Sequence, residues 1–402
     1  MDNCVIPHGY KATALGIIPQ EWEVMLLGNL SNSISSGRNK HRDAHGQYPV
    51  FGSTGIIGYS STYEYEGPVI LVARVGANAG TLNFASGQYD VSDNTLIITI
   101  KQNVYDYNFA YNQLTHYKLN KLVFGSGQPL ITSKQLKNIR IPVPPLAEQR
   151  KIAEVLGVWD KAIEKQARLI EKLALRKRAL MQRLLSAKLR LPGFSEPCKK
   201  IKLGDIGHFL SSNTLSRDCL NEQIGNIKNI HYGDILIKLP TIVDASFIHI
   251  PYVNDDVIVK SDYLKNGDII FADTAEDYTV GKAIEIINIQ AIPVTSGLHT
   301  IPFRPKSGIF VNRFLGYYVN STDYRRQLQP LIQGIKVYSI SKTALCKTTL
   351  KIPTLSEQTA IAEVLTAADR EIELAKEKLE RLRRQKRGLM QQLLTGKKRV
   401  KY

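Results

Sequence analysis

The 402-residue chain lacks the features that mark membrane-spanning, disulfide-linked and zinc-binding proteins. Its longest apolar runs are interrupted by charges or prolines well short of a membrane span, and no N-terminal signal is visible. The four cysteines are scattered and form no C-x-x-C pair, which argues against a disulfide framework and a zinc site. We therefore expect a cytoplasmic protein with reduced thiols, no bound metal and no membrane partner.

Catalytic motifs are missing as well. No G-x-x-x-x-G-K-[ST] phosphate loop occurs, which argues against an ATPase motor. The Asn/Asp-Pro-Pro-aromatic tetrapeptide that adenine methyltransferases use is also absent from the sequence. The glycine loop at 124–127 is followed by Pro129 and a β-type run rather than by the helix of a methyl-donor site. The acids at 273–277 lack the Glu-x-Lys of metal-dependent nucleases, and the histidines form no H-E-x-x-H pair. We expect a non-catalytic chain.

The chain does contain an internal repeat at a fixed offset of 209 residues. Glu148-Gln149 and the Ile-Ala-Glu-Val-Leu that follows them return at Glu357-Gln358. From Glu148 to Arg190, 21 of 43 positions are identical at this offset, far more than chance allows. The repeat predicts a bipartite molecule with approximate internal two-fold symmetry.

The two copies of the repeat have the pattern of long helices. Apolar residues keep three-and-four spacing over 146–187 and again after Pro353. Prolines at 142, 144 and 145 prevent helix formation upstream, and Leu191-Pro192-Gly193 ends the first copy. At about 1.5 Å per residue each helix would be roughly 60 Å long. A compact domain does not need helices of this length, so we interpret them as spacers.

The charges of the two helices predict how they pair. Residues 168–190 carry 8 basic and 1 acidic residue, whereas residues 357–377 carry 2 basic and 6 acidic residues. Antiparallel packing sets these segments against each other, while parallel packing brings the two basic ends together. Like charges disfavour the parallel arrangement. We predict an antiparallel coiled coil.

The bodies outside the helices read as β-rich. Short β-type runs such as 69–72, 95–100 and 268–271 alternate with turn residues, and short helices are expected at 108–119 and 312–328. The fold class is therefore α+β, with two β-rich domains each followed by a long helix. The expected segments are 1–145 (N-terminal segment and first domain), 146–195 (central helix), 196–352 (second domain) and 353–402 (C-terminal helix).

The net charge of +17 is concentrated in the two repeat segments, which contribute +7 and +5. A basic surface of this size favours a polyanionic partner such as nucleic acid. Attachment to ribosomes or to a membrane surface would be consistent with the same net charge. One alternative is therefore a non-catalytic basic coiled-coil scaffold that binds RNA or ribosomes. A self-sufficient methyltransferase or nuclease is disfavoured by the missing motifs.

Polar, glycine-rich loops are the candidates for nucleic-acid contact. Glycine lets a backbone approach phosphate closely, and Arg, Asn and Gln pair with guanine or adenine edges. Any one loop could be an ordinary solvated turn, but four such loops on one domain favour contact. The candidates in the first domain are Arg38, Lys40, Arg42, Ser53, Thr54, Arg74, Asn78 and Gln128. We expect Arg74, Asn78 and Gln128 at base edges and Lys40 and Arg42 at phosphates.

The second domain offers fewer such loops. Its candidates are Asn213, His299, Lys336 and Tyr338. The 209-residue offset pairs Gly125 with Gly334 and Ile131 with Ile340, which strengthens both glycine loops as functional. The poor match elsewhere predicts two related scaffolds that read different targets.

Four segments together carry a resemblance to a known family. They are 16–28 (Gly-Ile-Ile-Pro-x-x-Trp through Leu-Gly), 48–59 (Tyr-Pro-Val-Phe-Gly-Ser-Thr-Gly-Ile-Ile-Gly-Tyr), the Ile-Pro-containing stretches that end in Glu-Gln at 141–149 and 352–358, and the repeated Ile-Ala-Glu-Val-Leu. In this combination, over nearly its whole length, the chain resembles the specificity (S) subunits of type I restriction–modification systems.

The resemblance implies a function as well as a fold. It implies two target-recognition domains, each reading one half of a split asymmetric site in double-stranded DNA, with the helices as a ruler that docks two methylation subunits. Restriction subunits would join this core. The chain itself would need no cofactor, because S-adenosylmethionine is expected on the methylation subunits and ATP and Mg²⁺ on the restriction subunits. Trp159, Leu175 and Met181 are our candidates for subunit docking, although Trp159 would also fit the seam of the helix pair.

Overall fold

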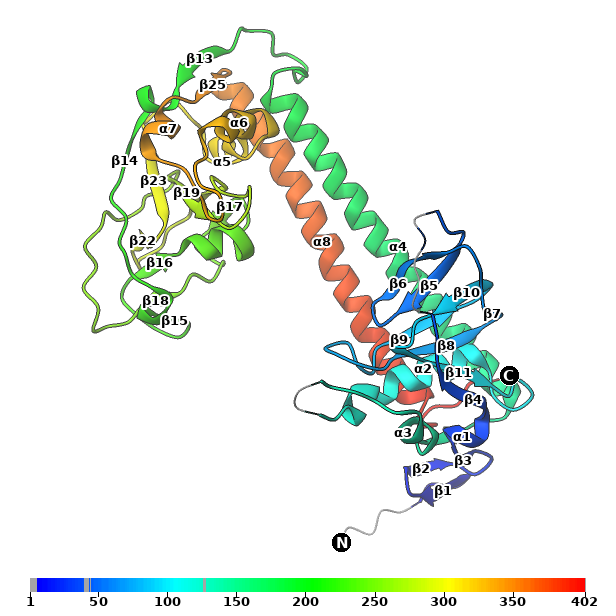
Figure 1. Ribbon diagram of the computed structural model, residues 1–402. Helices are drawn as coiled ribbons and strands as arrows, with labels where there is room; N and C mark the ends of the chain where they lie inside the picture. Colours follow the sequence, from blue (N-terminus) through cyan, green and yellow to red (C-terminus); the bar gives the residue numbers. More distant parts are fainter. Residues whose placement is uncertain (1–5, 40–42, 44, 126–127, 402) are drawn as a thin grey trace. The chain divides into compact units, whose positions relative to one another are not determined.

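The computed structural model describes residues 6–39, 43, 45–125 and 128–401. The chain forms two compact units. Unit 1 contains Met1–Ala167 and Glu377–Tyr402, and unit 2 contains Arg168–Lys376. Each unit therefore combines one β-rich body with part of helix α4 (Leu146–Leu185) and part of helix α8 (Leu355–Leu393), both labelled in Figure 1.

The body of unit 1 is built on two four-stranded sheets. The first has the order β4-β11-β8-β9, and the second the order β6-β5-β10-β7, in which β5 and β10 are parallel. Strands β3 and β12 form a separate ladder, as do β1 and β2. The elements are β1 (Tyr10–Thr13), β2 (Gly16–Pro19), β3 (Glu23–Leu26), α1 (Leu27–Leu30), β4 (Ser31–Ser36), β5 (Tyr48–Gly52), β6 (Gly55–Ser60), β7 (Tyr65–Glu66), β8 (Val69–Ala73), β9 (Leu82–Ala85), β10 (Gln88–Val91), β11 (Thr95–Ile100), α2 (Tyr107–Tyr117), α3 (Ser133–Lys137) and β12 (Arg140–Val143).

Strand β8 is buried on both faces because it lies between helices and the second sheet. Alternate residues of a strand face opposite sides of the sheet. Ile70 and Val72 pack with α2 and the long helices, whereas Val69 and Leu71 pack with Tyr89 and Val91 of β10. This double burial explains why the segment reads as a continuous apolar run rather than an alternating one.

The body of unit 2 repeats this plan with one added edge strand. Its larger sheet has the order β14-β23-β19-β21-β17, and its smaller sheet the order β15-β18-β16-β22, in which β16 and β22 are parallel. The elements are β13 (Lys199–Lys202), β14 (Gly207–Phe209), β15 (Leu220–Asn221), β16 (Lys228–Ile230), β17 (Ile242–Asp244), β18 (Tyr252–Val253), β19 (Ile269–Ala272), β20 (Thr274–Ala275), β21 (Ala283–Ile287), β22 (Val294–Ser296), β23 (Thr300–Pro305), α5 (Phe314–Val319), α6 (Thr322–Leu328), β24 (Tyr338–Ser339), α7 (Lys342–Cys346) and β25 (Thr349–Ile352).

Corresponding strands can be matched between the units. The order β4-β11-β8-β9 corresponds to β14-β23-β19-β21, and the parallel pair β5/β10 corresponds to β16/β22. The ladder of β3 with β12 corresponds to that of β13 with β25. Two bodies of very different sequence thus share one scaffold.

The two long helices are antiparallel, as their charges predict (Figure 1). In unit 1, Lys386 of α8 bonds Asp160 of α4 at 2.6 Å. In unit 2, Lys177 of α4 bonds Asp369 of α8. A later residue of α4 therefore pairs with an earlier residue of α8, as antiparallel packing requires. The basic part of α4 contacts the acidic first half of α8.

The repeated Glu-Gln pair fastens each helix start to its unit. Glu148 is fully buried and accepts hydrogen bonds from Trp22 Nε1 at 3.0 Å and from Arg399 Nε at 2.6 Å. These bonds to Glu148 raise the pKa of Arg399 above its usual range. In unit 2, Arg190 donates two hydrogen bonds of 2.6 Å to the buried Glu357. In each unit, the arginine that follows the end of one long helix therefore pairs with the start of the other.

None of the helices in the described part of the chain has the length and apolarity that a membrane crossing requires.

Candidate nucleic-acid interface

In unit 1, three loops meet beside the sheet β4-β11-β8-β9. They are the loop after β8 (74–80), the turn between β10 and β11 (92–94), and the glycine loop (124–130, described except for 126–127). Arg74 N donates to Asn94 O at 2.9 Å, and Ile131 N donates to Arg74 O at 2.9 Å. Gly76 N donates to Pro129 O at 2.8 Å. These three segments are called the loop cluster of unit 1.

Unit 2 has the same arrangement. Its loop cluster consists of 273–281 after β19, the turn 297–299 between β22 and β23, and the glycine loop 333–339. Asp273 N donates to His299 O at 3.1 Å, and Ile340 N donates to Asp273 O at 2.9 Å. Asp273 thus takes the place that Arg74 has in unit 1, and His299 takes the place of Asn94.

Both glycine loops are closed in the same way. Phe124 and Leu130 exchange two backbone hydrogen bonds, and Gln333 and Ser339 do the same. Gly334 has a φ of 111°, and a Cβ there would lie 1.9 Å from Val337 O. Gly125, with a φ of 100°, is similarly enclosed by Gln128 O. Only glycine fits such positions without strain, which explains why these two residues match at the 209-residue offset.

The loop cluster of unit 1 brings together the three side chains predicted for base edges. Arg74 is half-buried, and Asn78 and Gln128 are exposed. Within the described part of the chain, Arg74 takes part in no ion pair. Asn94, which the sequence analysis did not single out, is exposed on the adjoining turn.

Three further candidates of unit 1, Arg38, Ser53 and Thr54, lie on neighbouring strand ends and turns. Arg38 N donates to Val91 O, which joins the end of β4 to the end of β10. Ser92 N donates to Phe51 O, which joins the end of β5 to the same place. The Arg38 side chain is largely exposed and lies 3.8 Å from Glu64. Ser53 and Thr54 form the turn between β5 and β6. Lys40 and Arg42 lie outside the described residues.

His299, Lys336 and Tyr338 lie in the loop cluster of unit 2. His299 Nδ1 is 3.4 Å from Asp273 Oδ1, and its φ of 55° is uncommon for a residue other than glycine. Lys336 is exposed, and the Tyr338 ring stacks on Tyr278 with 4.8 Å between ring centroids.

Asn213 has a structural role in unit 2, which corrects its prediction as a DNA-binding residue. Its side chain is buried, and Nδ2 donates to Asn229 Oδ1 at 2.9 Å and to Thr295 Oγ1 at 3.3 Å. Its Oδ1 accepts from Leu215 N. The amide is committed to its own domain.

The sequence analysis missed the loop 273–281. Asp273, Glu276 and Asp277 were considered there only as nuclease acids, whereas their loop is the counterpart of 74–80. Hydrogen bonds from Thr279 lower the pKa of Asp277, which keeps its carboxylate charged. Arg325 of α6 fixes the loop by donating to Tyr278 O at 2.6 Å and to Val280 O at 3.0 Å.

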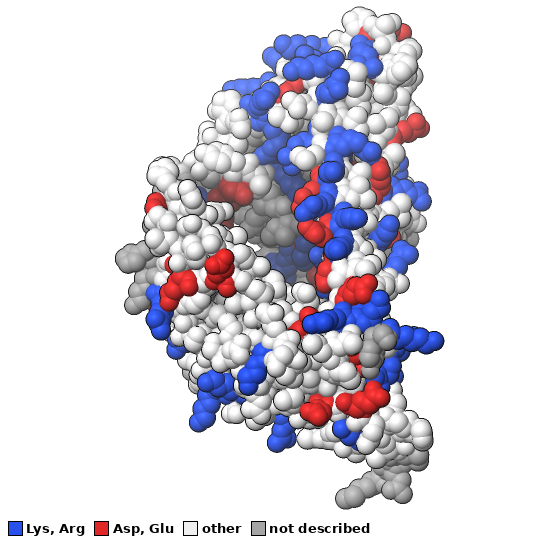
Figure 2. Space-filling view, turned by 90° about the vertical axis from the view of Figure 1, so that its right-hand side faces the viewer, with Lys and Arg blue, Asp and Glu red and all other residues white. Residues whose placement is uncertain are grey.

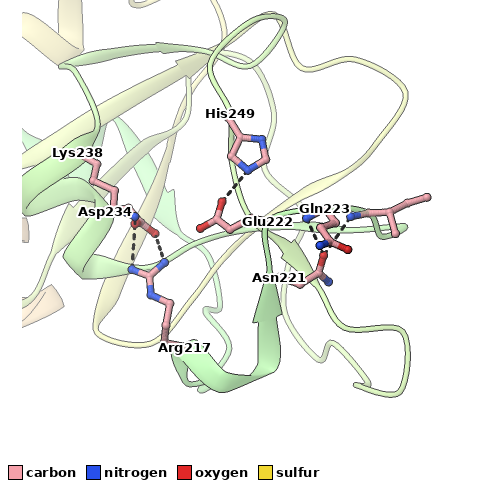
Figure 3. Close-up of polar contacts among 8 residues, drawn as sticks. Arg217, Asn221, Glu222, Gln223, Asp234, Lys238 and His249 are labelled. Atoms are coloured by element: carbon pink, nitrogen blue, oxygen red, sulfur yellow. Dashed lines mark hydrogen bonds and ion pairs between the residues drawn. The ribbon is translucent and has the colours of Figure 1, made fainter. Parts of the chain in front are cut away.

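A second group of polar side chains in unit 2 surrounds Asp234 and His249 (Figure 3). Arg217 donates two hydrogen bonds to the buried Asp234, at 3.0 and 2.9 Å, and Lys238 lies 3.8 Å from the same carboxylate. His249 pairs with Glu222 at 2.7 Å. The guanidinium of Arg217 is therefore engaged within the domain, and we exclude it from the candidates for phosphate contact.

The three docking candidates differ in exposure. Leu175 is 59% exposed on α4, Trp159 is half-buried, and Met181 packs against the core of unit 2. Only Leu175 is largely free to contact a partner. Figure 2 shows basic side chains spread over one face of the molecule, with fewer acidic ones among them.

In the described part of the chain, neither a group of metal ligands nor the apolar cavity of unit 1 coincides with the loop clusters. Among the described residues, no group of three His, Cys, Asp or Glu side chains could hold a metal ion. An apolar cavity of about 830 Å³ in unit 1 is lined by parts of β2, α2, β12 and α8, and by no residue of the loop cluster.

Comparison with known proteins identifies the family. The family described as "Type I restriction modification DNA specificity domain" matches residues 19–174 and 195–384. The MjaVIII specificity subunit of Methanocaldococcus jannaschii is 27% identical over 414 aligned residues, which cover 96% of this chain and 94% of that protein. The putative MjaX specificity subunit of the same organism is 25% identical, with 98% and 97% covered.

Solved structures share the fold. The S subunit from M. genitalium superposes with a TM-score of 0.55 at 18% identity, covering 93% of this chain and 96% of that one. A chain from a structure of type I restriction–modification complex assembly gives a TM-score of 0.58 at 18% identity, with 94% and 99% covered. The alternative of an RNA- or ribosome-binding scaffold gains no support from these relatives. Because the family matches most of the chain, in two successive regions, the chain belongs to the type I restriction–modification specificity subunits, the non-catalytic DNA-recognition components of these systems.

Proposed function

We propose that each loop cluster reads one half of a bipartite, asymmetric site in double-stranded DNA. The observation that carries the proposal is the same three-loop arrangement in both units, with different side chains on it. A shared scaffold suits a shared polymer, because phosphate contacts position a protein without reading sequence. Different side chains on that scaffold suit different bases.

The two clusters offer different chemistry to the base edges. In unit 1, Arg74, Asn78 and Gln128 provide hydrogen-bond donors of the kind that pair with guanine or adenine. In unit 2, Asp273 occupies the position of Arg74, and a carboxylate accepts a hydrogen bond from the cytosine amino group. The two half-sites should accordingly differ, which is what makes the site asymmetric.

The antiparallel helices would set the gap between half-sites and dock two methylation subunits. The repeat supports this, since related helical surfaces occur twice, and Leu175 is exposed on one of them. Restriction subunits would join that core. S-adenosylmethionine would then be bound by the methylation subunits, and ATP and Mg²⁺ by the restriction subunits, in the cytoplasm.

Exchange of one body tests the proposal. Residues 199–350 are replaced by the corresponding body of another family member, and the chimera is expressed with its partner subunits. Mapping of methylated adenines in the host should show one half-site replaced and the other half-site and the spacing unchanged. A chimera whose two half-sites both change, or neither, would show that the bodies do not read DNA independently.

A further inference from the structure

The glycine loop of unit 2 ends in exposed apolar side chains. Ile335 is 93% exposed, more than any other large apolar side chain in the described part of the chain, and Val337 is 53% exposed. Tyr278, from the neighbouring loop 273–281, is 67% exposed and stacks on Tyr338. Ile335, Val337 and Tyr278 are called the apolar tip.

The apolar tip is held on a rigid frame. Strands β20 and β24 pair Ala275 with Tyr338, which joins the two loops. Gly334 and the hydrogen bonds between Gln333 and Ser339 close the glycine loop at its base. The backbone of the loop is therefore held at its base, and its apolar side chains are not covered by their own domain.

The tip belongs to this recognition domain and not to the shared scaffold. At the 209-residue offset, Ile335 corresponds to Ser126 and Val337 to Gln128, both polar. The glycines and the loop closure are common to both units. Unit 1 has its exposed apolar side chain, Phe124, at the base of the loop, opposite the polar Gln333, whereas unit 2 has Ile335 and Val337 within the loop. Side chains that differ between equivalent loops of two reading domains are the ones expected to determine which bases are read.

We propose that the apolar tip recognises the 5-methyl groups of thymine in the half-site read by unit 2. Thymine alone presents an apolar group in the major groove. Lys336, exposed between Ile335 and Val337, is placed to contact a backbone phosphate beside them. This inference rests on the proposed function, because it needs unit 2 to read duplex DNA.

Replacement of thymine by uracil tests the inference, since it removes the methyl group and leaves base pairing intact. The complex with its methylation subunits is titrated with its mapped site and with a duplex carrying uracil throughout the unit 2 half-site. Each lost methyl contact should weaken binding about fourfold, equivalent to about 0.8 kcal/mol. I335A should bind the thymine duplex more weakly than the unsubstituted complex does, and should distinguish uracil from thymine less, because Val337 and Tyr278 remain.

Two controls isolate the effect. I224A removes another isoleucine of unit 2, 77% exposed but outside the loop cluster, and should keep the discrimination. Uracil in the half-site read by unit 1 should change binding by the same factor in I335A and in the unsubstituted complex.

Several results would overturn the inference: a unit 2 half-site without thymine, equal binding of both duplexes by the unsubstituted complex, full discrimination by I335A, or an I335A defect confined to subunit assembly. In all of these the complex still binds its mapped site specifically. Absence of any sequence-specific binding would instead contradict the proposed function.

Discussion

Arg74 and Asp273 show at the residue scale what separates the two recognition units. Arg74 follows β8 and Asp273 follows the corresponding strand β19. Both are held by the same backbone hydrogen bonds, yet their charges are opposite. In the proposed function, this difference changes the hydrogen-bonding partner from an acceptor on the base to a donor. Substitutions here should therefore alter which base is read, with little effect on the fold.

Arg74→Ala should blur one half-site, because it removes a bidentate donor from the loop cluster of unit 1. We expect a loss of about 1–3 kcal/mol in binding the specific site, with little change for unrelated DNA. Arg140, an exposed arginine on β12 outside the cluster, provides the matched control. Binding titrations with duplexes varied in one half-site measure both. Unchanged affinity and selectivity in Arg74→Ala would identify the loop as a solvated turn.

Glu285 should make the stability of unit 2 depend on pH. Burial raises the pKa of this β21 carboxyl to about 7, although it accepts hydrogen bonds from Arg313 N and from Gly316 N. A raised folded-state pKa means that the unfolded chain loses its proton first, so stability falls as pH rises from about 4.5 to about 7. The linked change is about 3 kcal/mol.

Glu285→Gln should flatten this part of the stability curve, because it cannot ionise. Denaturant titrations of both proteins between pH 5 and 8 measure the difference. The same slope in both proteins would mean that Glu285 stays charged in the folded state.

The matching glycines were predictable from the sequence, but the equivalence of Arg74 and Asp273 was not. Gly125 and Gly334 keep the 209-residue offset because a Cβ cannot be accommodated at either position. The loop between β8 and β9 is shorter than its counterpart between β19 and β21. The fixed offset of 209 residues therefore does not align Arg74 with Asp273. Burial of Asn213 could not be predicted either, since its partners Asn229 and Thr295 are distant in sequence.

At the scale of elements, local sequence patterns predicted the long helices but did not specify how the strands pair. The two long helices and their antiparallel pairing follow from apolar spacing and charge. The stretch 312–328, expected as a short helix, is divided at Asn320 and Ser321. The Ser321 hydroxyl caps α6 through Tyr324 N, and Asn320 Nδ2 donates to Ala283 O. The parallel pairs β5/β10 and β16/β22 depend on contacts between distant segments that no local pattern specifies.

The arginine clamps at the helix ends should contribute unequally to stability. Arg190→Ala should destabilise the protein, because it leaves the buried Glu357 without its charged partner. Arg399→Ala should cost less, because Glu148 keeps its hydrogen bond from Trp22. Denaturant unfolding of the two variants gives the comparison. Equal losses, or losses below about 1 kcal/mol, would mean that neither clamp fastens a helix end.

At the scale of the whole molecule, the repeat predicted two halves, while the structure divides the chain differently from the expected segments. Met390, Leu393 and Leu394 of the C-terminal helix belong to the core of unit 1, and Leu184 and Leu185 of the central helix to the core of unit 2. Each unit therefore needs both helices. This arrangement makes helix length separable from base reading, because each recognition body keeps its own helix ends.

The central claim is that the bodies read bases and the helices set their separation. Four helical residues inserted after Ala167 and four after Lys376, at the boundaries of the units, would lengthen both helices by roughly 6 Å, close to two base-pair steps of about 3.4 Å. The most direct measurement is the methylation map of a host that carries this variant with its partner subunits. We predict that both half-sites persist and that the gap between them grows by one or two base pairs. Altered bases at an unchanged spacing would contradict the account.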